Sequence, residues 1–393
     1  MRWMTGWITS ALLAAVSSAA MAQTPPVVVG AVVSQSGAHA GPATEYRKAL
    51  LLWADEINAA GGLLGRPVEL RVEDDGSEAV RAGSAYAELI GGGADVLIGP
   101  YGSAATLTGA AEAERAHRVM LNAAGPSGQI HKRAPRYVFQ TVPPYSAYAD
   151  GALALAREAR VESLYIAGRD DAGSREMAEA AQLQARALGF GHVEIEIYSG
   201  REIDFLPELY KAMQVEADGW IAFGEARDAA DILKTFKRQG YVPKLVYLRA
   251  SAEPAFVSLV GQDAEFILGS KEYDPRYPTA GNANFVERYT ARWSAAPGPL
   301  AAASYAAGTV LAAAVRAAGT VEAQKLRSVL ASLEIDTVLG RYRVDPSTGA
   351  QIGMKPIVVQ RLKGREQAVW PDALAGERML LPFAPWTERE RLR

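Results

Sequence analysis

Six short loops that follow apolar runs carry most of the side chains suited to binding a small molecule. They hold the hydroxyls of Ser36, Ser103 and Ser127 and the charges of Glu225 and Arg249. The loops lie at 34–37, 101–103, 123–127, 168–171, 224–227 and 249–251. Where such loops lead into helices, the backbone N–H groups at the helix starts favour an anion, most simply a carboxylate. These residue types indicate recognition of a small ligand.

The apolar runs before these loops have the length and composition of buried strands. Residues 27–33 are rich in valine and are followed by Ser and Gly residues at 34–37, which indicates a parallel strand followed by a loop. Apolar residues then recur at helical spacing through 45–59. Strands at 68–72 and 95–100 enclose a helix at 78–90, and this alternation predicts an α/β fold with a parallel sheet. In such sheets, ligands bind outside the carboxyl ends of the strands, where the loops lie.

A second alternation of strands and helices begins after the stiff break at Pro143-Pro144. Its expected strands lie at 163–167, 193–198, 219–223 and 244–248. Two such arrays in tandem predict two lobes that face each other across a cleft.

Side chains suited to catalysis or metal binding are sparse. The 4 histidines have no metal-ligand spacing, and the absence of cysteine excludes disulfides, cysteine nucleophiles and thiolate metal sites. Ser36 and Ser103 lack a Gly-x-Ser-x-Gly elbow and an identifiable base. The acidic run at 73–75 is most simply a solvated strand end. We therefore expect a protein that is not an enzyme and that uses no cofactor or metal.

Composition and the first residues indicate the class of protein and its location. The length of 393 residues favours two domains, and the net charge of -3 argues against a nucleic-acid partner. Residues 1–22 combine Arg2, a short apolar core and Ala20-Met21-Ala22, which is typical of a cleavable signal peptide rather than an N-terminal anchor. No later segment is expected to be long and apolar enough to cross a membrane. With no cysteine to carry a lipid, a free periplasmic protein is expected.

Three ordered motifs resemble those of a known family. They are Asp55 to Pro67 (DEINAAGGLLGRP), Val72 to Asp75 (VEDD), and Ile98-Gly99-Pro100 with Ser103. The chain is similar to the substrate-binding proteins of branched-chain amino-acid-type (Leu/Ile/Val-binding-like) ABC transporters, in the type I periplasmic binding protein family. The resemblance is strongest up to about residue 142 and returns at 271–274 and 305–307.

This resemblance implies two Rossmann-like lobes joined by a three-crossing hinge, which suits closure around a ligand. The expected boundaries are 23–143 plus 274–338 for the first lobe, 144–273 plus 339–370 for the second, and 371–393 for a C-terminal tail. Residues 341–344 and 355–360 are expected to form a hairpin-like section that completes the second lobe. For the tail, both a surface-wrapping segment and partial disorder stay open.

The family also implies a function. The chain is expected to be the periplasmic solute-binding component of an ABC importer. It would act as a monomer and deliver a small solute to an inner-membrane permease with its ATPase subunits. The alternative is a ligand-sensing protein of the same fold that signals to a membrane sensor.

The resemblance assigns a ligand-carboxylate contact to Ser103. The alternative is that Ser103 only caps the next helix. The loop Ala124-Gly125-Pro126-Ser127 departs from the family, because Pro126 stands where the amino-acid binders have a threonine. Proline has neither an N–H nor a hydroxyl, and Ser127 is a possible replacement from the next position.

Two further departures concern the far side of the cleft. Arg249 aligns with an acidic residue that holds the ligand ammonium in the family, so the charge is reversed. An arginine there favours a ligand carboxylate, unless it points to solvent or the loop aligns one residue off. Glu225 either pairs with Arg249 or itself meets an ammonium. Tyr145 replaces a cleft aspartate and would supply aromatic walls with Tyr101 alone or with both Tyr101 and Tyr273. Together the departures point away from a branched-chain amino acid and favour a carboxylate-bearing ligand such as an aromatic or dicarboxylic acid. The expected solute class is therefore a small carboxylate-bearing molecule: an amino acid, an aromatic acid or a dicarboxylate.

Overall fold

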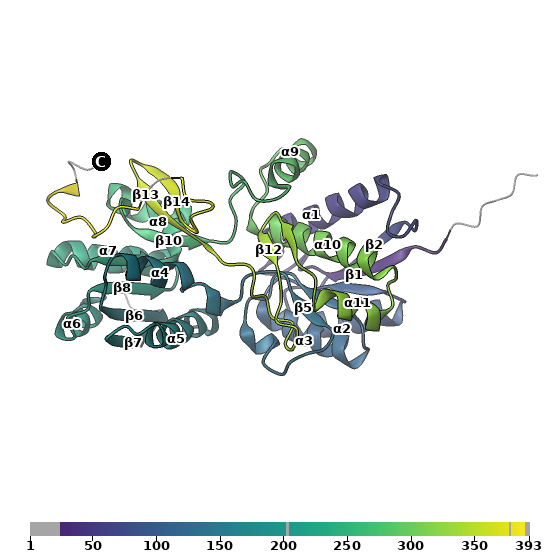
Figure 1. Cartoon of the computed structure of the whole chain (residues 1–393), viewed down its shortest axis with the longest axis horizontal. Coiled ribbons are helices and arrows are strands. Elements are labelled where there is room, and N and C mark those ends of the chain that lie inside the picture. The colour runs from purple at the N-terminus through teal and green to yellow at the C-terminus, as the bar shows by residue number, and fades with distance from the viewer. Residues whose placement is uncertain (1–23, 202–203, 377–378, 390–393) are drawn as a thin grey trace, which may run out of the picture.

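The computed structural model describes residues 24–201, 204–376 and 379–389. The expected signal peptide at 1–22 lies outside these residues. Figure 1 shows two lobes side by side, each with helices packed around a sheet. This arrangement confirms the α/β fold with two Rossmann-like lobes.

The first lobe contains a sheet of 5 parallel strands in the order β2-β1-β3-β4-β5. The strands are β1 (Val27–Val32), β2 (Val68–Glu73), β3 (Val96–Ile98), β4 (Met120–Asn122) and β5 (Val138–Gln140). Its helices are α1 (Ala40–Ala59), α2 (Ala79–Gly91), α3 (Ser103–Arg115), the short η1 (Gly128–Ile130), α9 (Asn282–Trp293), α10 (Pro299–Ala318) and α11 (Ala323–Leu330). All six residues of β1 are buried, as its uninterrupted apolar run predicts.

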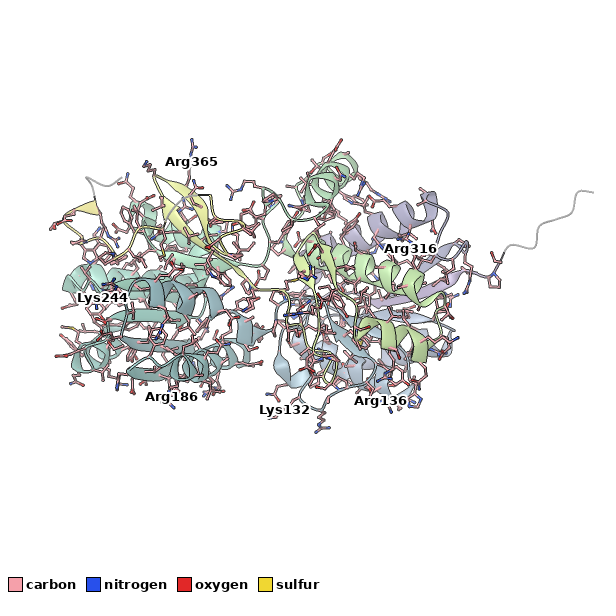
Figure 2. The ribbon with its side chains drawn as sticks, in the orientation of Figure 1. Lys132, Arg136, Arg186, Lys244, Arg316 and Arg365 are labelled. Atoms are coloured by element: carbon pink, nitrogen blue, oxygen red, sulfur yellow. The ribbon has the colours of Figure 1, made fainter. Side chains whose placement is uncertain are left out.

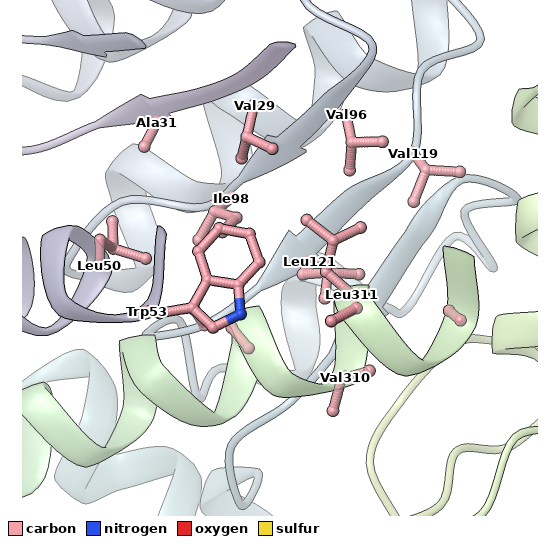
Figure 3. Packing of buried hydrophobic residues seen from close by; sticks show 14 of the residues in the cluster. Val29, Ala31, Leu50, Trp53, Val96, Ile98, Val119, Leu121, Val310 and Leu311 are labelled. Carbon is pink, nitrogen blue, oxygen red and sulfur yellow. The ribbon is translucent and has the colours of Figure 1, made fainter. Parts of the chain in front are cut away.

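The core of this lobe lies between the sheet and the pair α1 and α10. Val29, Ile98 and Leu121 from the strands pack with Trp53 of α1 and Leu311 of α10 (Figure 3). α10 has the length and composition of a membrane span, with a mean hydropathy of 1.4, so the expectation that no later segment would be long and apolar enough is wrong. However, 67% of its most apolar window is buried within the lobe, so it is the central core helix.

The second lobe contains a sheet of 7 strands in the order β14-β13-β10-β9-β8-β6-β7. The strands are β6 (Ser163–Arg169), β7 (His192–Tyr198), β8 (Gly219–Phe223), β9 (Leu245–Leu248), β10 (Leu268–Lys271), β13 (Ile357–Leu362) and β14 (Arg365–Trp370). Its helices are α4 (Asp150–Glu158), α5 (Ala172–Ala187), α6 (Leu206–Gln214), α7 (Ala226–Gln239) and α8 (Pro254–Val260), with short turns η2 (Tyr145–Ala147), η3 (Arg249–Ala252) and η4 (Gly261–Ala264). β13 and β14 run antiparallel to their neighbours, whereas the other pairs are parallel.

Three segments connect the lobes. The chain leaves the first sheet after β5, returns after β10, and crosses again before β13. The third crossing lies later than expected, because residues 339–354 do not complete the second lobe. β12 (Gly340–Tyr342) pairs with β11 (Ile335–Thr337), and Tyr342 and Val344 are buried in the first core. The expected hairpin of 341–344 with 355–360 is therefore wrong, and β13 pairs with β10 and β14 instead.

The described part of the tail packs on the second lobe. Phe383 is 1% exposed within its core. The guanidinium of Arg389 lies 3.9 Å from the ring centroids of both Phe383 and Trp386. Of the two possibilities left open, the surface-wrapping segment is the one that the structure shows for these residues.

Candidate functional site

A cavity of about 500 Å³ lies between the two lobes, beyond the carboxyl ends of strands from both sheets. Residues following β3 and β4 line it from the first lobe, and residues following β6, β8, β9 and β10 line it from the second. Its polar and charged lining side chains are Tyr101, Ser103, Tyr145, Tyr148, Asp171, Ser174, Glu225, Arg249 and Glu272. The volume is typical of small-molecule sites, which enclose about 300–1,000 Å³.

Ser103 forms the polar centre of the first-lobe wall. It is the first residue of α3, and Gly102 occupies the capping position with a φ of 91° and no side-chain cap. The alternative that Ser103 caps this helix is therefore wrong. Its Oγ accepts a hydrogen bond of 3.2 Å from the Ser127 N–H, which leaves the hydroxyl proton for another acceptor. The N–H groups in the first turn of α3 have no acceptors within the helix, so this wall favours an anion.

Arg249 lies on the opposite wall, immediately after β9. Its Nη2 lies 2.7 Å from Oε1 of Glu253, and its side chain is 23% exposed. Its Nε is buried without a hydrogen-bond partner. Burial opposes the charged form, but the carboxylates of Glu272 and Glu253 outweigh this effect and raise the pKa of Arg249. The guanidinium therefore remains positively charged beside the cavity.

Glu272 and Tyr148 form a hydrogen-bonded pair at the same wall. The Tyr148 hydroxyl donates to Oε1 of Glu272. Burial, with the negative charge of Glu272, raises the pKa of Tyr148 well above its usual value, so the phenol stays protonated and continues to donate. Glu272 thus brings a second charge, opposite in sign to Arg249, to the second-lobe wall.

Tyrosine rings provide the aromatic part of the lining. The rings of Tyr145 and Tyr148 meet edge to face, with centroids 5.8 Å apart. Tyr101 contacts His39 in the same manner at 5.3 Å. Burial raises the pKa of Tyr145, although the nearby Arg249 acts against this shift. The third expected ring, Tyr273, is 5% exposed, donates to Asn282 at 2.7 Å and does not line the cavity.

The charges of the lining are mainly negative. Asp171, Glu225 and Glu272 contribute carboxylates, and Arg249 contributes the cation. All four belong to the second lobe, whereas the first lobe contributes hydroxyl and backbone donors. The two walls of the cavity therefore differ in the ligand groups that they favour.

The matched family accounts for this geometry. Residues 26–367 match the family described as "Periplasmic binding protein", and this segment contains every residue that lines the cavity. The chain belongs to this family. The expected family is confirmed, and family membership implies a periplasmic location.

Curated relatives align with most of this periplasmic binding protein. The "Leu/Ile/Val-binding protein homolog 8" of Brucella abortus is 23% identical over 306 residues, which cover 73% of this chain and 74% of the relative. The relative of the same name from Brucella suis is 23% identical over 300 residues, 72% of this chain and 73% of its own.

Solved structures share the fold. An ABC transporter substrate-binding protein from Desulfitobacterium hafniense, in complex with Leu, superposes with a TM-score of 0.70 at 24% identity, covering 87% of this chain and 99% of that one. A solute-binding protein of an ABC transporter from R. palustris, in complex with benzoate, superposes with a TM-score of 0.65 at 18% identity. The superposition covers 90% of this chain and 98% of that one. At these identities the likeness shows the type I periplasmic binding protein fold.

Most of the residues expected at the site do line the cavity of this periplasmic binding protein. They are Tyr101, Ser103, Ala124, Tyr145, Glu225 and Arg249. Ser36 does not line it, because its hydroxyl donates to Asp74 at 2.7 Å within a neighbouring loop pair. The expectation for Ser36 relied on strand-end position alone, which did not include this contact.

Gly125 and Ser127 also turn away from the cavity. Both backbone groups of Gly125 bond to the side chain of Asn122, and a Cβ at this position would lie 2.7 Å from the Thr106 hydroxyl. Ser127 Oγ donates to Glu176 at 2.7 Å. The hydroxyl that was expected to replace the one lost at Pro126 is therefore bonded to the protein itself.

The structure distinguishes the two possibilities for Glu225. Its carboxylate lies 3.3 Å from Arg169, and it forms a capping box with Asp228 at the start of α7. The expected alternative of a pair with Arg249 is not formed. With 69% of its side chain exposed at the cavity, Glu225 retains the second possibility, contact with a cationic ligand group.

Sequence reasoning missed Tyr148, Asp171 and Glu272 as site residues. Asp171 lay inside an expected loop, and Glu272 lay inside a motif of the family resemblance, so both carried a signal. Tyr148 lay outside every expected loop and motif and carried none. In the part of the chain that the structure describes, no group of three or more His, Asp or Glu side chains is arranged to hold a metal ion.

Proposed function

We propose that this protein is the periplasmic solute-binding component of an ABC importer. Its two lobes close around a small carboxylate-bearing solute, and the closed form delivers that solute to an inner-membrane permease with its ATPase subunits. The observation that carries the proposal is the cavity of about 500 Å³ lined by strand ends of both lobes. The relatives named as Leu/Ile/Val-binding homologues support the same role.

The carboxylate is held at the first lobe. The Ser103 hydroxyl and the first N–H groups of α3 are donors on one wall, and the positive end of the helix favours a negative charge there. Hydrogen bonds to a charged acceptor are the stronger kind, so this contact anchors the ligand.

The far end of the ligand meets the second lobe. Three lining carboxylates against one guanidinium make a second ligand carboxylate unfavourable, because Arg249 is already paired with Glu253. A donor group such as an ammonium is compatible with Glu225 and Glu272. The tyrosine walls accommodate an apolar or aromatic middle. Among the expected solutes, an amino acid therefore fits better than a dicarboxylate.

Thermal unfolding of residues 23–393 against a solute panel tests this function. The panel contains leucine, isoleucine, valine, phenylalanine, benzoate, succinate and an uncharged amide. A solute that binds only the folded state raises the free energy of unfolding by about 2.7 kcal/mol when its concentration is a hundredfold above its Kd. Stabilisation by amino acids supports the proposal. Stabilisation by the amide and not by any acid would overturn the carboxylate assignment.

Uptake distinguishes delivery from sensing. Cells lacking this gene should take up the radiolabelled solute more slowly, and expression of the chain should restore the rate. Unchanged uptake together with a loss of ligand-induced transcription would overturn the transport role.

A further inference from the structure

A carboxylate of the second lobe reaches across to the first lobe beside the cavity. Glu176 lies on α5, and its Oε2 accepts a hydrogen bond of 2.7 Å from the Ser127 hydroxyl. Its Oε1 accepts a hydrogen bond of 2.7 Å from the Gly128 N–H. Both donors follow β4 in the first lobe. The two bonds use both oxygens of one carboxylate, and both are charge-assisted.

This contact is connected to the proposed ligand donor. Ser127 donates its hydroxyl to Glu176 and its N–H to the Oγ of Ser103. Ser103 Oγ is thereby an acceptor for Ser127 and also lines the cavity, so its own proton is left for another acceptor, such as a ligand. A chain of hydrogen bonds therefore leads from the second lobe, through Ser127, to the hydroxyl at the ligand wall.

The local sequence permits this close approach. A Cβ at position 128 would lie 3.1 Å from Oε1 of Glu176, closer than most side chains tolerate. Glycine lets the backbone N–H come within hydrogen-bond distance of the carboxylate. Glu176 is half-buried, whereas Glu179, almost one turn further along α5, is exposed and its carboxylate lies 3.9 Å from Arg175.

We propose that Glu176 is a closure residue: its carboxylate joins the lobes through Ser127 and Gly128 and thereby positions the Ser103 hydroxyl for the ligand. The proposal rests on the proposed solute-binding function and deepens it. Glu176 does not line the cavity, so it acts through Ser127 and is a positioning residue. The contact requires lobe closure because its partners belong to different lobes.

A residue that acts on closure has a recognisable effect on affinity. The apparent Kd of a ligand is the intrinsic Kd divided by the fraction of protein in the competent state. Loss of the Glu176 contact lowers this fraction, so it weakens every ligand by a similar factor. Loss of a direct contact weakens only the ligands that use that contact.

The distance between two spin labels, one on each lobe, tests closure without any ligand. The chain has no cysteine, so cysteines introduced at Lys132 and Arg186 carry spin labels at defined sites. Both side chains are exposed, and they lie on different lobes (Figure 2). Glu176→Ala should shift the distances of the unliganded protein towards a more open distribution, whereas Glu179→Ala should leave them as in the parent. Identical distributions for Glu176→Ala and the parent would overturn the proposal.

Affinity measurements complete the test. Glu176→Ala should weaken all ligands found by the solute panel by about tenfold, as loss of hydrogen bonds to a charged group predicts. Ser127→Ala should weaken binding less, because the hydrogen bond from the Gly128 N–H to Glu176 remains. In the variant that carries both substitutions, the fold-increase in Kd should be smaller than the product of the fold-increases in the two single variants. Weakening of one ligand alone would overturn the role in closure. If no solute binds, the proposed function fails, but the label distances still decide the role of Glu176.

Discussion

The outer guanidinium nitrogen of Arg249 lies 2.7 Å from a carboxylate oxygen of Glu253, four residues further along the chain. This pair determines which guanidinium N–H groups of Arg249 remain available to a ligand. One edge is bonded to Glu253, whereas Nε has no partner and Glu272 lies close enough to raise the pKa of Arg249. A ligand oxygen therefore meets a partly neutralised cation rather than a free one.

Replacement of Arg249 tests its contribution. We expect Arg249→Ala to weaken the binding of carboxylate ligands by about tenfold, because truncation leaves the half-buried carboxylates of Glu253 and Glu272 without their counter-charge at the cavity wall. Isothermal titration with the solutes found by thermal unfolding measures the effect. Arg227→Ala is the matched control, since its side chain is 75% exposed and its carboxylate partner is 3.9 Å away. Full affinity in Arg249→Ala would remove this residue from the site.

Replacement of Ser103 tests the carboxylate anchor. Ser103→Ala removes the hydroxyl donor and leaves the N–H groups of α3 in place. We expect binding of carboxylate ligands to weaken by about tenfold, the usual effect of one hydrogen bond to a charged group. The free energy of unfolding without ligand should change by no more than about 1 kcal/mol. Equal weakening of an uncharged ligand would show that Ser103 does not recognise the carboxylate.

Asp274 at the second crossing predicts a pH dependence of stability. Burial would raise the pKa of this carboxyl, but hydrogen bonds from Arg276 and the charge of Lys271 outweigh burial and lower the pKa to about 2. A folded-state pKa below the unfolded value stabilises the fold at pH values above the unfolded pKa of about 3.9. That stabilisation is lost as the pH falls through about 2.

Denaturant unfolding of Asp274→Asn measures this contribution. The variant should be less stable than the parent by about 1–2 kcal/mol at neutral pH, and the difference should shrink between about pH 4 and pH 2. Asp336→Asn is the control, because the Asp336 side chain is 60% exposed and lies 3.7 Å from Arg341. A difference that stays constant over this range would contradict the assignment.

The packing of the C-terminal tail on the second lobe predicts that Phe383 contributes strongly to the free energy of unfolding. Phe383 is 1% exposed in the second core, so Phe383→Ala should lower the free energy of unfolding by about 3–5 kcal/mol. Leu380→Ala, at a side chain that is 46% exposed, should change it by about 0.5 kcal/mol or less. Urea unfolding compares the two. If Phe383→Ala lowered the free energy of unfolding as little as Leu380→Ala, the tail would contribute nothing specific to the core.

Local sequence was sufficient to predict the strands and the edge of the sheets where the cavity lies. A valine-rich run such as β1 can be buried on both faces only within a parallel sheet, and such sheets place their loops at one edge. The loops that hold Ser103, Glu225 and Arg249 were located in this way, because each loop follows a strand in the chain. The ligand role expected of Ser103 came from the family resemblance.

Tertiary structure decided which partner each polar side chain meets. Ser127 could not be assigned to Glu176 from sequence, since the two residues lie 49 positions apart and on different lobes. Arg249 pairs with Glu253 rather than Glu225 because η3 turns the chain back immediately after β9. Residues 339–354 joined the first lobe because Tyr342 is buried there, a packing outcome that no local pattern expresses. Hydrophobic periodicity is local and therefore readable in the sequence, whereas hydrogen-bond pairing depends on how separately folded elements approach one another in space.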